Sequence, residues 1–219
     1  MIADSGSLKA FFIRAFLWLP PCFFVWYLAA STHAAIAGWF ARVIVNIVTP
    51  GVVVALERSG SELAFVTTIK IYPAPGQAAV LVPAVKALSY TYGLAVFFAL
   101  MLAERAALRK IAIGAVILLL FQCWGIAFDF LVQVGVRLGP ELVTQANLRG
   151  WRVEGTALGY QLGARIFPPL VPVILWAYLG TFFRNRLQRD STRSTDHIAN
   201  GCRKNWPQSG VMSRKHRFE

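Results

Sequence analysis

The pattern of apolar and polar positions divides the chain into long apolar runs separated by short polar stretches. A helix that crosses a bilayer needs about 20 mostly apolar residues. Four runs approach or reach that length, namely residues 11–30, residues 90–103 with the apolar residues before them, residues 111–132 and residues 167–183. The pattern therefore predicts a mainly α membrane protein with about four transmembrane helices.

A further apolar run, residues 34–48, contains regularly spaced small and polar residues. Gly38, Arg42 and Asn46 recur every four residues, which places them on one face of a helix. Such a stripe favours an interfacial amphipathic helix, lying in the outer interface or packed on the helix bundle, over another lipid-facing span.

The segment of about residues 50–88 has the composition of strands. Residues 52–58 and 62–72 are rich in β-branched side chains, and the sequence SGS between them is a turn signal, so they predict a β-hairpin. Residues 78–88 supply a possible third strand, which Pro83 places at an edge. So small an outer-side hairpin or three-stranded sheet needs the amphipathic helix or a partner to pack against.

Composition supports a membrane protein and separates its C-terminal end. The chain of 219 residues is 57% hydrophobic and 15% charged, which leaves too little polar surface for an ordinary soluble domain. Nine of its 22 Lys and Arg residues follow residue 183. We expect an integral membrane domain at 1–184 and a disordered, basic cytoplasmic tail at 185–219 that contacts anionic lipid. No nucleic-acid-binding fold or aromatic platform accompanies this basic charge.

The distribution of Lys and Arg predicts the orientation, because these residues concentrate in short loops on the cytoplasmic side of the membrane. They cluster before the first span, in the loop at residues 104–110 and after residue 183. All three clusters agree with cytoplasmic termini and with outer segments at residues 31–89 and 136–160. The alternative for the first apolar run is a cleaved signal peptide.

Polar residues interrupt the third and fourth spans. Gln122, Asp129 and Gln133 lie on one helix face, because spacings of seven and four are whole turns. An aspartate facing lipid costs roughly 2.5–3.5 kcal/mol, so Asp129 needs a partner. Gln161 and Arg165 are one turn apart at about the same depth. We predict a polar seam with an Asp129–Arg165 contact, which is either a structural clamp or a binding site facing the outer compartment.

The cysteines and histidines give no metal-binding pattern. Cys22 and Cys123 lie within predicted spans, where a cysteine is most often a packing residue. The alternative is a thiolate nucleophile, which needs a base or cation nearby, and no His lies within the predicted spans. No ligand set, phosphate loop, dinucleotide fingerprint or channel filter is present, so the sequence predicts no metal or cofactor.

Several segments occur in a characteristic order, namely LWLPPCF, the β-rich segment, YGLAVFFALMLAER, FQCWGIAFDFL and GYQLGARIFPPLVPVILW. In this order, over about residues 8–187, the chain resembles the exosortase H-associated membrane proteins. These are small bacterial proteins encoded beside a membrane-embedded sorting transpeptidase. The resemblance implies a multi-pass protein of the bacterial cytoplasmic (inner) membrane whose partner is the exosortase or its sorting substrate.

Two functional hypotheses follow from the resemblance. The first is a non-enzymatic accessory or scaffold protein of an exosortase-type envelope protein-sorting system. The neighbouring exosortases resemble cysteine transpeptidases that use a Cys and Arg residues at the outer membrane face. The alternative is therefore a membrane-embedded cysteine transpeptidase or protease that uses Cys123 and Arg165.

Reporter fusions test the predicted orientation. Fusions after Leu108 and after Leu187 are expected to report a cytoplasmic location, whereas a fusion inside the turn at residues 59–61 is expected to report the outer side. Alkaline phosphatase and fluorescent-protein fusions measure the two sides. A cytoplasmic signal at the turn would mean that residues 34–48 span the membrane, and the orientation would be wrong.

Overall fold

The structure is a computed structural model that describes residues 3–74, 77–137, 144–146, 148 and 150–180. These residues belong to the compact unit Met1–Gly180. The predicted basic tail at 185–219 lies outside the described residues.

The described part of the chain is mainly helical, as predicted. Its helical elements are α1 (Ala3–Val48), α2 (Leu88–Thr91), α3 (Gly93–Ala103), α4 (Leu108–Val132), the π-helical η1 (Gln133–Arg137), α6 (Trp151–Gln161), the π-helical η2 (Leu162–Ile166) and α7 (Phe167–Leu179). Three stretches are long and apolar enough to cross a membrane: Leu8–Val48, Leu108–Arg137 and Trp151–Leu179. The second predicted span, with the residues before it, is the shorter apolar helix Leu88–Ala103. The fold class is confirmed.

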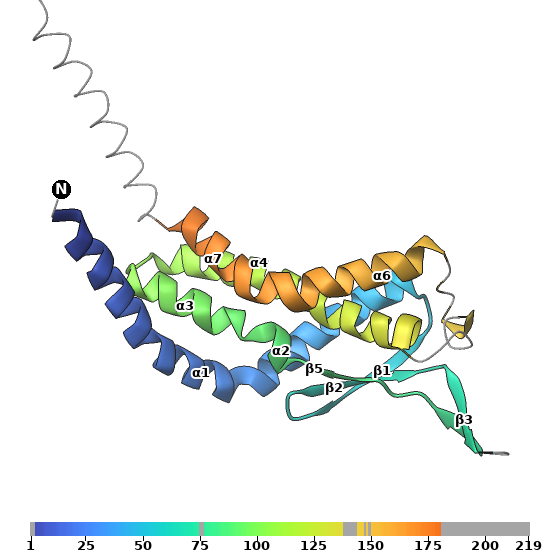
Figure 1. Ribbon diagram of the computed structural model, residues 1–219. Helices are drawn as coiled ribbons and strands as arrows, with labels where there is room; N and C mark the ends of the chain where they lie inside the picture. The colour runs from blue at the N-terminus through green and yellow to red at the C-terminus, as the bar shows by residue number, and fades with distance from the viewer. Residues whose placement is uncertain (1–2, 75–76, 138–143, 147, 149, 181–219) are drawn as a thin grey trace, which may run out of the picture. The chain divides into compact units, whose positions relative to one another are not determined.

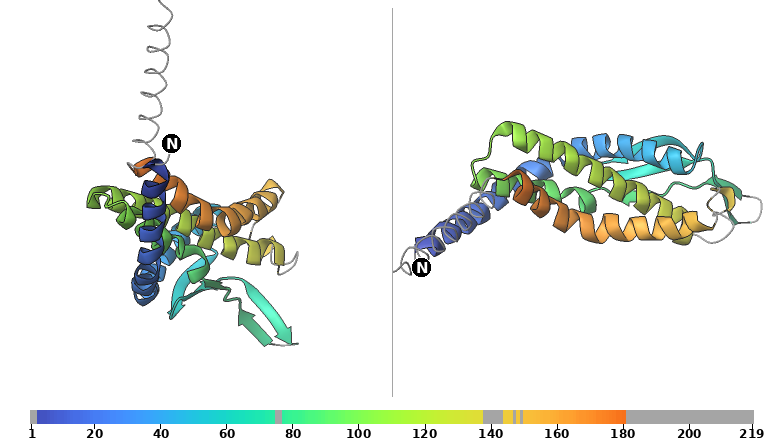
Figure 2. Two further views of the ribbon diagram at one scale, coloured as in Figure 1. Left: turned by 60° about the vertical axis from the view of Figure 1, so that its left-hand side comes forward. Right: turned by 90° about the horizontal axis from the view of Figure 1, so that it is seen from above.

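Helix α4 lies between the other long helices. It packs against α1 and against α6 and α7, and in the right-hand view of Figure 2 it runs between the second half of α1 and α6. Helix α3 fills the space along α1 and α7. Any polar residue that α4 turns inward therefore meets another element of the protein rather than lipid.

Helix α1 corrects one sequence prediction. The first predicted span and the amphipathic segment form a single helix of 46 residues, about 69 Å long at 1.5 Å per residue (Figure 1). Of the two predicted settings for the stripe, the structure has the packed one, with the sheet as the neighbour: Gly38 approaches Leu63, and the Arg42 guanidinium donates to Val54 O at 2.5 Å. Periodicity shows that two helix faces differ, but it does not decide which one is buried.

The sheet forms beside the second half of α1. Strands β1 (Val53–Ser59), β2 (Glu62–Thr67) and β5 (Ala84–Lys86) pair antiparallel in the order β1-β2-β5. The predicted hairpin is confirmed, with Ser59 opposite Glu62 and Gly60 at φ 61° in the turn. The third strand follows Pro83 at the sheet edge, also as predicted.

One predicted strand is divided in the structure. Residues 62–72 contribute to β2 and to β3 (Lys70–Ala74), which pairs with β4 (Gln77–Val80) in a separate two-stranded sheet. This β3–β4 hairpin projects away from the helices (Figures 1 and 2).

A single apolar core joins α1, the three-stranded sheet and α4. Leu63 and Phe65 alternate along β2 and are both fully buried, and the Phe65 ring lies 4.8 Å from that of Phe130 on α4. On α1 the core face consists of small side chains: Ala34, Ala37, Ala41 and Val45. The larger apolar side chains of the same segment, including Trp39 and Ile47, point outward. This arrangement suits a helix whose outer face contacts lipid.

Glycines allow the closest helix contacts. A Cβ built at Gly163 would lie 2.8 Å from Gly125 Cα, so η2 and α4 touch through their backbones. Small residues permit this approach between membrane helices, where packing rather than hydrophobic burial drives association. Gly93 makes a similar contact, because its Cβ would lie 2.7 Å from Pro168 O.

The glycine contact predicts a difference between two matched substitutions. Gly163→Ala is expected to lower the stability by about 1–3 kcal/mol, because the new methyl group overlaps α4. Gly155→Ala is the control, since its Cβ meets only Trp151 at 3.9 Å and alanine favours the helix at both positions. Thermal unfolding in detergent measures both variants. Equal stability of the two would show that the contact is not tight.

Candidate functional site

The inner part of the polar seam is a hydrogen-bonded link between three helices. Gln122 of α4 is 4% exposed. Its Oε1 accepts from His33 Nε2 of α1 at 2.6 Å, and its Nε2 donates to Thr91 O of α2 at 3.5 Å. An amide oxygen is only an acceptor, so His33 must carry its proton on Nε2. Gln122 therefore joins α1, α2 and α4.

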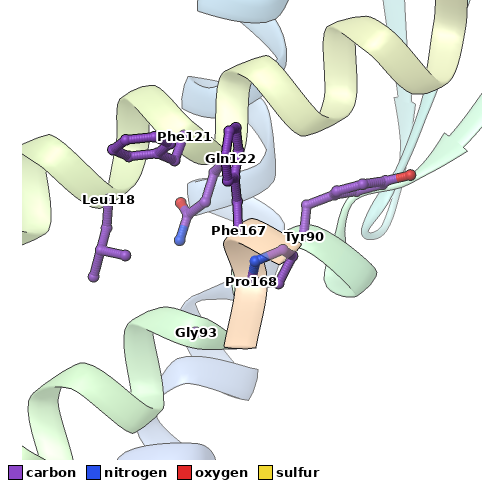
Figure 3. Close-up of a pocket in the computed structure, with 7 residues that line it drawn as sticks. All are labelled: Tyr90, Gly93, Leu118, Phe121, Gln122, Phe167 and Pro168. Atoms are coloured by element: carbon purple, nitrogen blue, oxygen red, sulfur yellow. The ribbon is translucent and has the colours of Figure 1, made fainter. Parts of the chain in front are cut away.

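A small cavity lies beside this link. Its volume of about 10 Å³ is close to that of one water molecule. Figure 3 shows that the Gln122 amide points toward it, whereas the Tyr90 hydroxyl points away. The other lining residues come from α3, α4 and α7: Gly93, Leu118, Phe121, Phe167 and Pro168. The cavity is too small for an organic substrate.

The part of the seam nearest the sheet centres on Asp129, which is partly buried. The Tyr90 hydroxyl makes a side-chain hydrogen bond with its carboxylate. Gln133 Nε2 lies 3.5 Å from Asp129 Oδ1 and also donates to Ala84 O of β5 at 3.1 Å. Together, Tyr90, Asp129 and Gln133 connect the end of α4 to α2 and to the sheet.

Arg137 supplies the positive charge that acts on Asp129. Its guanidinium donates to the Tyr160 hydroxyl of α6 at 3.1 Å and lies 5.3 Å from the Tyr160 ring centroid. Arg137 follows Asp129 by eight residues along α4 and η1, so it lies close to the same helix face. The seam thus extends to α6 through Arg137 and Tyr160.

The predicted Asp129–Arg165 contact is wrong. Gln161 and Arg165 are exposed, and within the described residues no hydrogen bond or ion pair joins either of them to Asp129. The reason is helical geometry. Gly159 and Gly163 face α4, and residues two positions further along a helix point to the opposite side.

Three seam residues were not predicted from the sequence: His33, Tyr90 and Tyr160. His33 was placed beyond the first span, but α1 continues through it without a break. Tyr90 begins the second predicted span and Tyr160 precedes the fourth, and at such positions a phenolic hydroxyl with an apolar ring is common. Their partners lie on other elements, and no local pattern in the sequence identifies such pairs.

Both described cysteines are buried among apolar side chains. Cys123 is 1% exposed and belongs to the core that joins α1, α4 and the sheet. Cys22 packs with Ala95 and Ala99 of α3. In the described ranges no three His, Cys, Asp or Glu residues form a group that could hold a metal ion.

The fold and the seam define a small multi-pass membrane protein whose central helix is hydrogen-bonded to a sheet at one end. The chain belongs to the exosortase H-associated membrane protein family, whose model matches residues 5–183. This confirms the resemblance, and the family name indicates an association with exosortase H. No curated protein and no solved structure matches the chain.

The His33–Gln122 bond predicts non-additive stability. His33→Leu or Gln122→Leu alone is expected to cost about 1–2 kcal/mol, because each leaves a poorly solvated polar partner. The double variant should lose less than the sum of the single losses. Unfolding in detergent gives the three values, with the exposed Gln161→Leu as a control. Strictly additive losses would rule out the coupling.

Proposed function

We propose that this protein is a non-enzymatic accessory or scaffold protein of an exosortase-type envelope protein-sorting system in the bacterial inner membrane. It binds the sorting enzyme or its substrate. The observation that carries this proposal is the family match over residues 5–183, since the family is named for its association with exosortase H.

The polar seam supports a structural rather than catalytic role for α4. Gln122, Asp129 and Gln133 bond to neighbouring helices and to the sheet. The volume of the cavity beside Gln122 is far smaller than the roughly 300–1,000 Å³ of typical small-molecule sites. These groups hold the helices and the sheet together, which a scaffold requires.

The β3–β4 hairpin is the surface best suited to a protein partner. On the β3 side, the Gln145 side chain accepts from Lys70 N at 3.1 Å and donates to Lys70 O at 3.3 Å, so this edge is covered there. On the other side, β4 is an outer strand of its sheet. Tyr72, Val80 and Val82 are exposed around it.

An extended segment of the partner fits this edge. A two-stranded hairpin is only marginally stable in water, and an uncovered strand edge pairs readily with another strand. Strand addition satisfies the backbone groups of β4, while the exposed apolar side chains contribute contact area. The partner segment is part of the exosortase or of its sorting substrate.

Co-purification with the co-expressed exosortase tests the proposal. The wild-type chain is expected to retain the enzyme, and Val80→Lys to lower its recovery by about tenfold, the effect of losing a central contact at an interface. Val54→Lys is the matched control, because Val54 is similarly exposed but lies on β1. If the wild-type chain retains neither the exosortase nor its substrate, the accessory role is wrong.

Substrate sorting in cells that co-express the exosortase distinguishes a scaffold from an enzyme. Cys123→Ala and Cys123→Ser are expected to support normal substrate sorting, because a packing thiol tolerates replacement at a modest cost of about 1 kcal/mol. If both variants accumulate and still bind the partner but abolish sorting, a cysteine transpeptidase replaces the scaffold.

A further inference from the structure

A groove of about 410 Å³ lies between the end of α1, the middle of α4 and the length of α6. Its floor and walls include Ile47, Trp124, Phe128 and Leu158. All three walls belong to the stretches that are long and apolar enough to cross a membrane. A groove with such walls is suited to an apolar occupant from the bilayer.

The polar atoms within the groove wall are already used. Trp124 Nε1 donates to Gly159 O at 3.1 Å, and Thr156 Oγ1 donates to Arg152 O at 2.7 Å. These bonds leave an apolar surface along most of the groove. An occupant of this part is an apolar chain that requires no hydrogen bonds.

The rim of the groove differs from its interior because it holds a cation. Arg152 lies in the first turn of α6, next to Trp151, which is 77% exposed. Within the described part of the chain, no hydrogen bond or ion pair uses the Arg152 guanidinium. A tryptophan beside a basic residue is typical of the boundary between hydrocarbon and lipid headgroups.

The groove is long enough for much of an acyl chain. Arg152 at the rim and Leu162 at the far end are ten residues apart, which is about 15 Å along a helix. A molecule with an anionic head and an apolar chain of this length fits both ends of the groove.

A second groove provides a comparison. It has a volume of about 300 Å³ and lies between α1, α3 and the start of α4, where Trp18, Cys22, Phe98 and Leu108 line it. Its lining contains no charged side chain. An acyl chain fits this groove as well, but nothing in its wall selects a headgroup.

We propose that the groove at α6 binds an anionic phospholipid, with the phosphate on the Arg152 guanidinium and an acyl chain along Trp124, Phe128 and Leu158. A guanidinium presents two parallel N–H donors to phosphate oxygens, which gives both affinity and orientation. This lipid fills the space between α1 and α6, and so stabilises their separation on the surface of α4.

Native mass spectrometry of the purified full chain tests this site. The protein is equilibrated with equal amounts of phosphatidylglycerol and phosphatidylethanolamine in mixed micelles. The wild-type chain is expected to retain phosphatidylglycerol preferentially, and Arg152→Ala to retain about fivefold less of it. Arg165→Ala is the control, since it removes an exposed cation of η2 that does not line the groove.

A second variant tests the position of the tail. Gly155 lines the groove, and a Cβ there meets only Trp151, so Gly155→Phe is expected to fill the groove without disturbing the helix contacts. Its retention of phosphatidylglycerol should fall, whereas that of Gly155→Ala should not. Thermal unfolding of each variant checks that the fold is intact.

A photoreactive residue at Leu158 identifies the occupant directly, even if Gly155→Phe fails to fold. Cross-linking to phospholipid supports the proposal, whereas cross-linking to a protein would assign the groove to a partner helix and overturn it. Equal retention of both lipids by the wild-type chain, or an unchanged Arg152→Ala, would overturn it as well. Co-purification of the exosortase is a separate readout, so a failed lipid site leaves the accessory role standing.

Discussion

The polar side chains of α4 need partners inside the protein, because the hydrocarbon of a bilayer offers none. This constraint explains how the other elements are arranged. Gln122 bonds to α1 and α2, Gln133 to the sheet, and Arg137 to α6. Each bond crosses from the central helix to a different neighbour. The partners of the seam consequently lie on the inward faces of these neighbours, and the apolar side chains pack around them.

Close packing depends on small residues at the points where these bonds bring helices together. Gly125 and Gly163 let α4 and η2 touch through their backbones, and the alanines of α1 let the sheet approach that helix. The large apolar side chains are then free to face lipid. The usual relation between side-chain size and burial in soluble proteins is therefore reversed along the second half of α1, where Ala37 is buried and Ile47 is exposed.

The family relationship gives this architecture its biological context. A scaffold has to keep its shape within the membrane while it presents a surface to a partner. For the proposed scaffold, the hydrogen-bonded helices meet the first requirement, and the exposed edge of β4 suits the second. The phospholipid proposed at α6 would add a contact between this end of the bundle and the headgroup layer.

The sequence by itself determined the class of fold and most of its elements. Long apolar runs predict membrane helices because an isolated polar backbone cannot exist in hydrocarbon. The turn signal at Gly60 and the position of Pro83 correctly predicted a hairpin with a third strand at the edge, because turn geometry and the missing proline N–H act locally. Gln122, Asp129 and Gln133 were likewise placed on one helix face by spacing alone.

Only the tertiary structure decided which residues complete the seam. The sequence paired Asp129 with Arg165 by depth and charge, whereas the structure surrounds Asp129 with Tyr90, Gln133 and Arg137. Spacing defines the faces of one helix, but the rotation of that helix against its neighbours depends on packing over its whole length. On the helix from Trp151 to Leu179, the close approach at Gly159 and Gly163 sets this rotation and turns Arg165 away from α4.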